Sequence, residues 1–141
     1  MKDEITITQN LLENKIYTVR GLQVMLDKDL AELYQVEPKR LNEQDKRNTE
    51  RFPENFRFQL TDDEYQNLRS QIATSSSTDV LRSQNATLEH GGRRYLPYVF
   101  TEQGVSMLSA ILKSSLAIKV SIQIIEAFVS MRRIISSNTL I

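Results

Sequence analysis

Hydrophobic positions follow two different patterns along the first third of this chain. Ile16, Val19, Val24 and Leu26 flank Arg20-Gly21, and this arrangement predicts two short strands joined by a glycine turn. After residue 26 the apolar residues recur at intervals of three and four, the spacing of a helix with one buried face. We therefore expect a hairpin that leads directly into a helix, with Asp27 as the helix N-cap.

The stretch DKDLAELYQVEPKRLNEQDKRN, residues 27 to 48, predicts two short helices separated by a break. Pro38 marks the start of the second helix, because proline lacks an N–H that the first helical position does not use. This helix, expected to run to about Thr49, has Leu41 as its clearest apolar anchor. A helix with so little to bury is either a solvated surface helix or one whose partner lies outside the protein.

The remainder of the chain predicts further strands and helices in alternation. Phe56, Phe58 and Leu60 alternate as in a strand with one buried face. Thr61 and Glu64 have the spacing of a capping box, which opens a helix with its apolar residues on one side. After a polar loop at 73–92 that contains the repeat LRSQIAT and LRSQNAT, GGRRYLPYVF predicts another strand. Pro97 places that strand at a sheet edge or a bulge.

Two helices are expected at the end of the chain. Thr101 is suited to cap the first, and the second, from 116 to about 135, is the most hydrophobic element. Apolar residues off its main stripe, including Ile118 and Ile122, indicate more than one neighbour. Burial in the core alone and a homodimer interface both account for this, and we slightly favour the homodimer.

These elements suggest a domain at residues 15–135 that carries a loop insertion at 73–92. An N-terminal arm at 1–14, containing Ile5 and Ile7, is expected to form an edge strand or to remain loose. Residues 136–141 are expected to form a C-terminal tail. At 141 residues the chain is long enough for one hydrophobic core.

Composition narrows the class of protein. The chain is 40% hydrophobic and 26% charged, has no cysteine, and shows neither a membrane-spanning run nor a secretory signal. These features fit a cytoplasmic protein without disulfides or thiolate metal sites. His90 has no companion ligand, the four glycines form no phosphate loop, and no carboxylate pair suggests acid–base catalysis. We expect no metal, no cofactor and no enzymatic activity.

The two-helix unit has the residue types that a helix-turn-helix requires. Ala31 permits close helix crossing, and Leu30, Tyr34, Val36 and Leu41 can fill the joint. In such a unit the N-terminal part of the second helix meets base edges in the major groove, and later residues meet phosphates. The candidates for base contact are Lys39, Arg40, Asn42 and Gln44. The candidates for phosphate contact are Lys46, Arg47, Asn48 and Arg51, with Arg93 and Arg94 in a wing-like loop, although a solvated loop explains the last two equally well.

Three residues weigh against tight insertion of the second helix into DNA. Gln35 occupies a turn position where glycine is usual, at a cost of about 1 kcal/mol. Glu43 and Asp45 would be repelled by phosphates unless they point away. The net charge of the whole chain is zero, so a positive face would have to come from geometry.

The motifs DLAELY, KRLNEQ, RFPENFRFQLT and YLPYVFTEQGVSML closely resemble those of the ORF-six N-terminal domain family, which is related to the KilA-N and Bro-N domains. The resemblance covers roughly residues 15 to 135. It implies an α+β fold, a small winged-helix-like domain with a helix-turn-helix, short β-hairpins and a long hydrophobic C-terminal helix. Family members commonly carry glycine where this chain has Gln35, and a neutral or apolar residue near Asp45.

The resemblance also implies a function, namely a DNA-binding transcriptional regulator of phage or prophage type, antirepressor-like, with double-stranded DNA as partner. Its basic second helix maps onto residues 38–49 here. The alternative is a protein-interaction module that binds a repressor or other regulatory protein without sequence-specific DNA contact.

Overall fold

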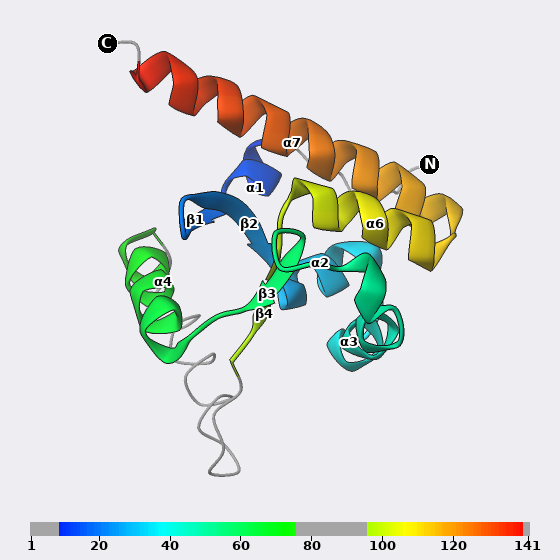
Figure 1. The fold of residues 1–141 in the computed structure, drawn as a ribbon. Helices are drawn as coiled ribbons and strands as arrows, with labels where there is room; N and C mark the ends of the chain where they lie inside the picture. The colour runs from blue at the N-terminus through cyan, green and yellow to red at the C-terminus, as the bar shows by residue number, and fades with distance from the viewer. Residues whose placement is uncertain (1–8, 76–95, 140–141) are drawn as a thin grey trace. The chain divides into compact units, whose positions relative to one another are not determined.

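The computed structural model describes residues 9–75 and 96–139 of the chain, and Figure 1 shows the arrangement of their helices and strands. The chain divides into two compact units. The larger unit comprises residues 1–58 and 99–141, and the smaller comprises 59–98. Helices and an antiparallel sheet occur together in the described residues, so the α+β class predicted from the sequence is confirmed.

The predicted hairpin is present. Strands β1 (Tyr17–Val19) and β2 (Leu22–Leu26) pair antiparallel, with Val19 opposite Leu22. Arg20 and Gly21 between them have φ angles of 55° and 73°. Two successive positive φ angles give the turn a twist that matches the right-handed twist of paired strands. Tight two-residue closure therefore explains why glycine stands at position 21.

The four strands within the described residues have the order β1-β2-β4-β3. Strand β4 (Tyr98–Phe100) pairs antiparallel with β2, with Met25 opposite Phe100, and β3 (Arg57–Gln59) follows it in the sheet. Of the two alternatives expected for the strand at Pro97, a sheet edge or a bulge, the sheet edge is therefore wrong. Pro97 immediately precedes β4, where its missing N–H removes no bond from the ladder.

The N-terminal residues that the structure describes form a helix, α1 (Gln9–Glu13), rather than the edge strand or loose arm expected. Leu12 is fully buried. The Gln9 side chain donates to the backbone carbonyl of Gln123, and Ser130 Oγ donates to Glu13 Oε2 at 2.8 Å. The segment is helical because it can attach both its apolar and its polar residues to the last helix. Ile5 and Ile7 lie outside the described residues.

Helices α2 (Asp27–Tyr34) and α3 (Pro38–Arg47) form the predicted two-helix unit, and the short 3-10 turn η1 (Thr49–Arg51) follows α3. Gln35 ends α2 in the left-handed conformation, with φ 61° and ψ 44°, as expected for that turn position. Pro38 occupies the start of α3, as predicted. The N-cap of α2 is Leu26 and makes no side-chain cap bond, so the N-cap role predicted for Asp27 is wrong.

The smaller unit contains α4 (Asp62–Ser75) and its predicted capping box. The Thr61 backbone N–H donates to Glu64 Oε1 at 2.8 Å, and the Glu64 N–H donates back to Thr61 Oγ1 at 3.2 Å. Tyr65, Leu68 and Ile72 are buried along one side of the helix. Most of the predicted loop insertion, including the second LRSQ copy, lies outside the described residues.

Helix α6 (Glu102–Leu112) begins at Thr101, whose side chain accepts a bond from the Gly104 N–H, as the sequence predicts. The long helix α7 (Ser115–Thr139) packs against α1, α2 and α6 in the larger unit (Figure 1). Its buried residues include Val120, Ile124 and Phe128. The buried hydroxyls of Tyr34 and Ser121 lie 2.6 Å apart and join α2 to α7. The first helix of the two-helix unit is thereby fixed to the core.

Candidate nucleic-acid interface

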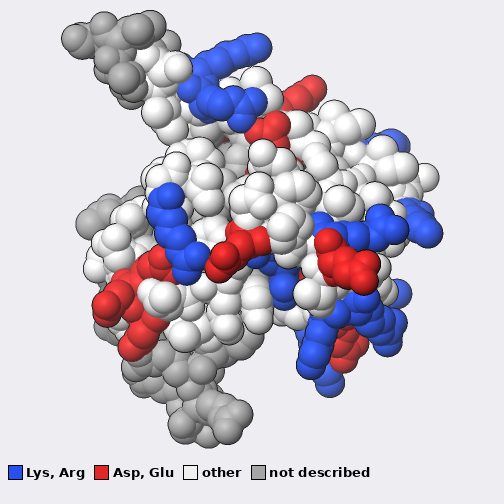
Figure 2. Space-filling view, viewed as in Figure 1, with Lys and Arg blue, Asp and Glu red and all other residues white. Residues whose placement is uncertain are grey.

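The outward face of α3 is a strip of charged side chains. Lys39, Arg40, Lys46 and Arg47 are exposed, whereas Leu41 is fully buried and anchors the opposite face. In Figure 2, Lys and Arg side chains gather over the region where Figure 1 places α3, with acidic side chains among them. These four basic residues of the predicted interface are therefore available to a partner.

An open hollow of about 470 Å³ lies along this face. Its lining residues are Glu37, Lys39, Arg40, Glu43, Gln44 and Arg47. With residues about 100° apart around the helix, Glu43 lies between Lys39 and Arg47. The acidic side chain of Glu43 thus lies in the middle of the basic strip.

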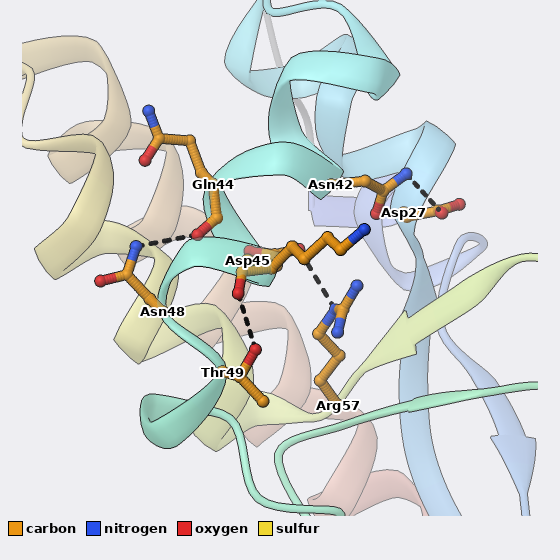
Figure 3. Close-up of polar contacts among 8 residues, drawn as sticks. Asp27, Asn42, Gln44, Asp45, Asn48, Thr49 and Arg57 are labelled. Carbon is orange, nitrogen blue, oxygen red and sulfur yellow. Dashed lines mark hydrogen bonds and ion pairs between the residues drawn. The ribbon is translucent and has the colours of Figure 1, made fainter.

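Asp45 does not lie on the outer face of α3, where its negative charge would oppose DNA binding. It is fully buried on the inner face of α3, one helical turn after Leu41. Its Oδ2 lies 3.2 Å from Arg57 Nε on strand β3 (Figure 3). The Arg57 guanidinium also lies over the Phe100 ring, 5.7 Å from its centroid. A phosphate on the outer face of α3 would therefore not meet this carboxylate directly.

A second polar contact fixes α3 from the start of α2. The Asn42 side-chain nitrogen donates to Asp27 Oδ2 at 3.3 Å, and Asp27 is itself buried. We call Asp27, Asn42, Asp45 and Arg57 the inner cluster. It joins α2, α3 and β3 within the larger unit. The angle at which α3 presents its outer face therefore depends on polar contacts as well as on Leu41.

The inner cluster changes the acidity of Asp45. Burial raises the pKa of Asp45 to about 7, the Arg57 guanidinium opposes that rise, and the nearby Asp27 carboxylate adds to it. Loss of water disfavours the ionised form more strongly than a single ion pair restores it. Burial also raises the pKa of Asp29 in α2. Lys15, whose Nζ lies 3.6 Å from the Asp29 carboxylate, opposes that rise.

The structure separates the residues predicted to meet DNA into three groups. Lys39, Arg40, Lys46, Arg47 and Arg51 are exposed, and Gln44 is partly exposed on the lining of the hollow. Asn42 and Asn48 are partly buried and already engaged, Asn42 with Asp27 and Asn48 with the Gln44 carbonyl at 2.8 Å (Figure 3). Arg93 and Arg94, and with them the wing-like loop, lie outside the described residues. The two asparagine side chains thus serve the protein's own structure, and the described cationic side chains among these candidates face outward.

Sequence reasoning missed Arg57 and the inward role of Asp27 and Asp45. A signal for Asp45 existed, because a residue four positions after Leu41 shares its helix face. A signal for Arg57 also existed, since this charged residue stands between Phe56 and Phe58 in a predicted strand. Neither signal identifies the pairing, which depends on where β3 lies against α3.

The described part of the chain contains no group of metal-ligating side chains and no helix that could span a membrane. Within residues 9–75 and 96–139, no three acidic or histidine side chains are grouped closely enough to hold a metal ion. In the same ranges, every helix is too short or too polar to cross a membrane. His90 lies outside them.

The fold and the site define a small α+β protein that presents a charged helix on a two-helix unit. The chain belongs to the ORF6N domain family, whose model matches residues 14–111. This is a phage-associated family, in agreement with the resemblance seen in the sequence motifs. No curated protein and no solved structure gives a significant match.

Proposed function

We propose that this protein is a DNA-binding regulator of phage or prophage type that contacts the duplex through the outer face of α3. The single observation that carries the proposal is the segregation of charge on this helix. Four cations, at positions 39, 40, 46 and 47, face outward, while Asp45 is buried against Arg57. Because Asp45 is turned inward, the outer face of α3 is more positive than it would be with both Glu43 and Asp45 exposed.

The division of side chains on α3 favours phosphate contact over base reading. Asn42, a predicted adenine reader, is held by Asp27. Lys39, Arg40 and Gln44 therefore remain as the candidates for base edges. Lysine and arginine contacts with phosphates fix register and dominate affinity, whereas base-edge contacts supply specificity. We therefore expect a strongly salt-dependent interaction with modest sequence preference.

A second candidate function is binding of a repressor or other regulatory protein, in the manner of an antirepressor. The observation that favours it is Glu43 in the centre of the basic strip. A face of mixed charge suits a partner protein with complementary charges better than it suits a uniform phosphate backbone.

The test is titration of mixed-sequence duplex DNA at low and at moderate salt. Replacing Arg40 and Arg47 by alanine is expected to weaken binding roughly tenfold or more and to reduce the slope of log K against log salt by about 0.9 for each phosphate that the protein no longer neutralises. The matched control is the Lys113→Ala/Arg133→Ala variant, which removes the same charge from exposed positions outside α3. Equal binding by both variants, or no binding by the wild type at low salt, contradicts the proposal.

Glu43 separates the two candidate functions. Glu43→Gln removes a negative charge from the middle of the strip, so it is expected to strengthen DNA binding by roughly threefold to tenfold at low salt. Glu50→Gln, at an exposed position in η1 beyond the hollow, is the control for total charge. If DNA binding is unchanged and capture of a regulatory protein is abolished instead, the protein-partner function is supported.

A further inference from the structure

The outer side of α7 carries apolar residues that the core does not use. Ile118 and Ile122 are 50% and 53% exposed, and Ile125 and Val129 are partly exposed. We call these four residues the outer stripe. Their spacings are four, three and four, which is the heptad spacing of a coiled-coil seam. The core face of the same helix, with Val120, Ile124 and Phe128, lies on the opposite side.

Helices α1, α2 and α6 pack against α7 and leave the side chains at 118 and 122 exposed. Gln9 and Glu13 of α1 bond to α7 at Gln123 and Ser130. Glu102 of α6 pairs with Arg132 at 2.6 Å, beyond the C-terminal end of the outer stripe. Figure 1 shows α1 and α6 on one side of α7 and no described element on the other. The outer stripe therefore keeps two exposed isoleucines, Ile118 and Ile122, and two partly exposed residues that no described element covers.

Two charged residues beside the outer stripe are complementary to each other, and this favours a second copy of the chain as the partner of the stripe. Lys119 and Glu126 are exposed, lie seven residues apart and stand on the same flank of the seam. In an antiparallel pair of α7 helices, Ile122 packs against Ile125 of the partner subunit, and Ile118 packs against Val129 of the partner subunit. In this register Lys119 faces Glu126 of the partner subunit, and the twofold axis makes the contact twice.

A parallel pair would lack these charge contacts. In parallel packing the positions that face Lys119 and Glu126 are Ser114 and Ser121, and the Ser121 hydroxyl is buried against Tyr34. We propose that the outer stripe is a homodimer interface in which two α7 helices pack antiparallel, with Lys119 and Glu126 forming reciprocal ion pairs. The seam is only about 16 Å long, so the dimer is expected to dissociate on dilution.

Sedimentation velocity of the full chain without DNA, over a range of concentrations, tests this interface independently of any DNA binding. The wild type is expected to be a dimer that dissociates on dilution. Ile122→Glu is expected to weaken the dimer about 100-fold, since each protomer buries this side chain. The matched control is Ile134→Glu, at a site that is 44% exposed on the same helix but off the stripe, and it is expected to leave the dimer unchanged.

Charge reversal tests the orientation and does not depend on the isoleucine variant folding. Lys119→Glu and Glu126→Lys should each weaken the dimer by about fivefold, and the double variant should restore it, because reversed charges again attract across the axis. A wild type that stays monomeric at all concentrations overturns the proposal. So does a double variant no better than the single ones, or an Ile134→Glu variant that dissociates as readily as Ile122→Glu.

Discussion

At the scale of single residues, the decisive feature is the carboxyl group of Asp45. It belongs to a helix in which six of ten residues are charged, and yet it is fully buried, with Arg57 Nε 3.2 Å away. Such a pair contributes little net stability, because desolvation costs about as much as attraction returns. Its effect is to favour one orientation of α3, in which the cations face outward and this acid faces inward.

Asp45 should make the stability of the protein depend on pH. Its pKa is about 7 in the folded chain and about 4 in an unfolded one, so the folded state binds this proton more tightly. The protonated Asp45 carboxyl therefore stabilises the folded state. This contribution is fully present below about pH 4 and is lost as pH rises to 7. Through this group the free energy of unfolding should fall over that range by on the order of a few kcal/mol. Urea unfolding at several pH values measures it.

The control for that measurement is Asp45→Asn, which keeps the shape of the side chain and cannot ionise. Its stability should vary less with pH between 4 and 7 than that of the wild type. Asp29, whose pKa is also raised, remains in both proteins and cancels from the comparison. Parallel pH profiles for the two proteins would contradict the assignment of this titration to Asp45.

Gly104 is the second residue whose identity the packing dictates. A Cβ at this position would overlap the carbonyl oxygen of Phe56 and lie 3.3 Å from the Phe100 ring. Gly104→Ala should therefore lower the free energy of unfolding by roughly 3 kcal/mol. Gly21→Ala provides the contrast, because its φ is +73° but the space around it is open, and it should cost only about 1 kcal/mol. Chemical denaturation gives both values, and similar losses would contradict the steric argument.

At the scale of elements, the two-helix unit depends on the turn at Gln35. This residue takes the left-handed conformation, and the N–H of Val36 closes the turn by donating to the Ala31 carbonyl at 3.0 Å. Pro38 then starts α3 after Glu37 in an extended conformation. The sequence thus defines where each helix ends, while the inner cluster adds contacts that hold α3 against α2 and β3.

Gln35→Gly should stabilise the protein by roughly 0.5 kcal/mol. Glycine removes the left-handed strain of about 1 kcal/mol and gives back part of it through greater freedom of the unfolded chain. Gln35→Ala keeps the strain and should leave the free energy of unfolding close to that of the wild type. Thermal and denaturant unfolding of the three proteins decide the point. An alanine variant as stable as the glycine variant would contradict it.

At the scale of the whole molecule, the last helix completes the core of the larger unit. The family model matches residues 14–111, yet α7 begins at Ser115 and buries Ala117, Ile124 and Phe128, among others. Helices α1, α2 and α6 all pack against it. The family segment by itself therefore lacks one wall of the core it needs.

A chain that ends at residue 112 should accordingly fail to fold, because α1, α2 and α6 would expose the apolar surface that α7 covers. A chain that ends at residue 133 is the control, since positions 134–136 are exposed. Circular dichroism and the dispersion of amide proton signals should show a cooperative fold for the longer chain alone. Cooperative unfolding of the 112-residue chain would contradict the role given to α7.

Local signals in the sequence determined much of the fold. The hairpin at Arg20-Gly21, the start of α3 at Pro38, the capping box at Thr61 and the cap at Thr101 depend on residues within a few positions of one another, so each could be predicted. The family followed from long motifs. The α+β class followed from the family resemblance that these motifs carry.

Only the tertiary structure decided which charged residues face outward. The contact of Asp45 with Arg57 joins positions twelve apart, and that of Asn42 with Asp27 joins positions fifteen apart. Whether such groups meet depends on how α3 rolls against α2 and β3, and no local pattern encodes that angle. The helical character of residues 9–13 likewise depended on α7, more than one hundred residues away. Local chemistry sets the elements of this protein, and burial against distant elements sets which side chains remain available to a partner.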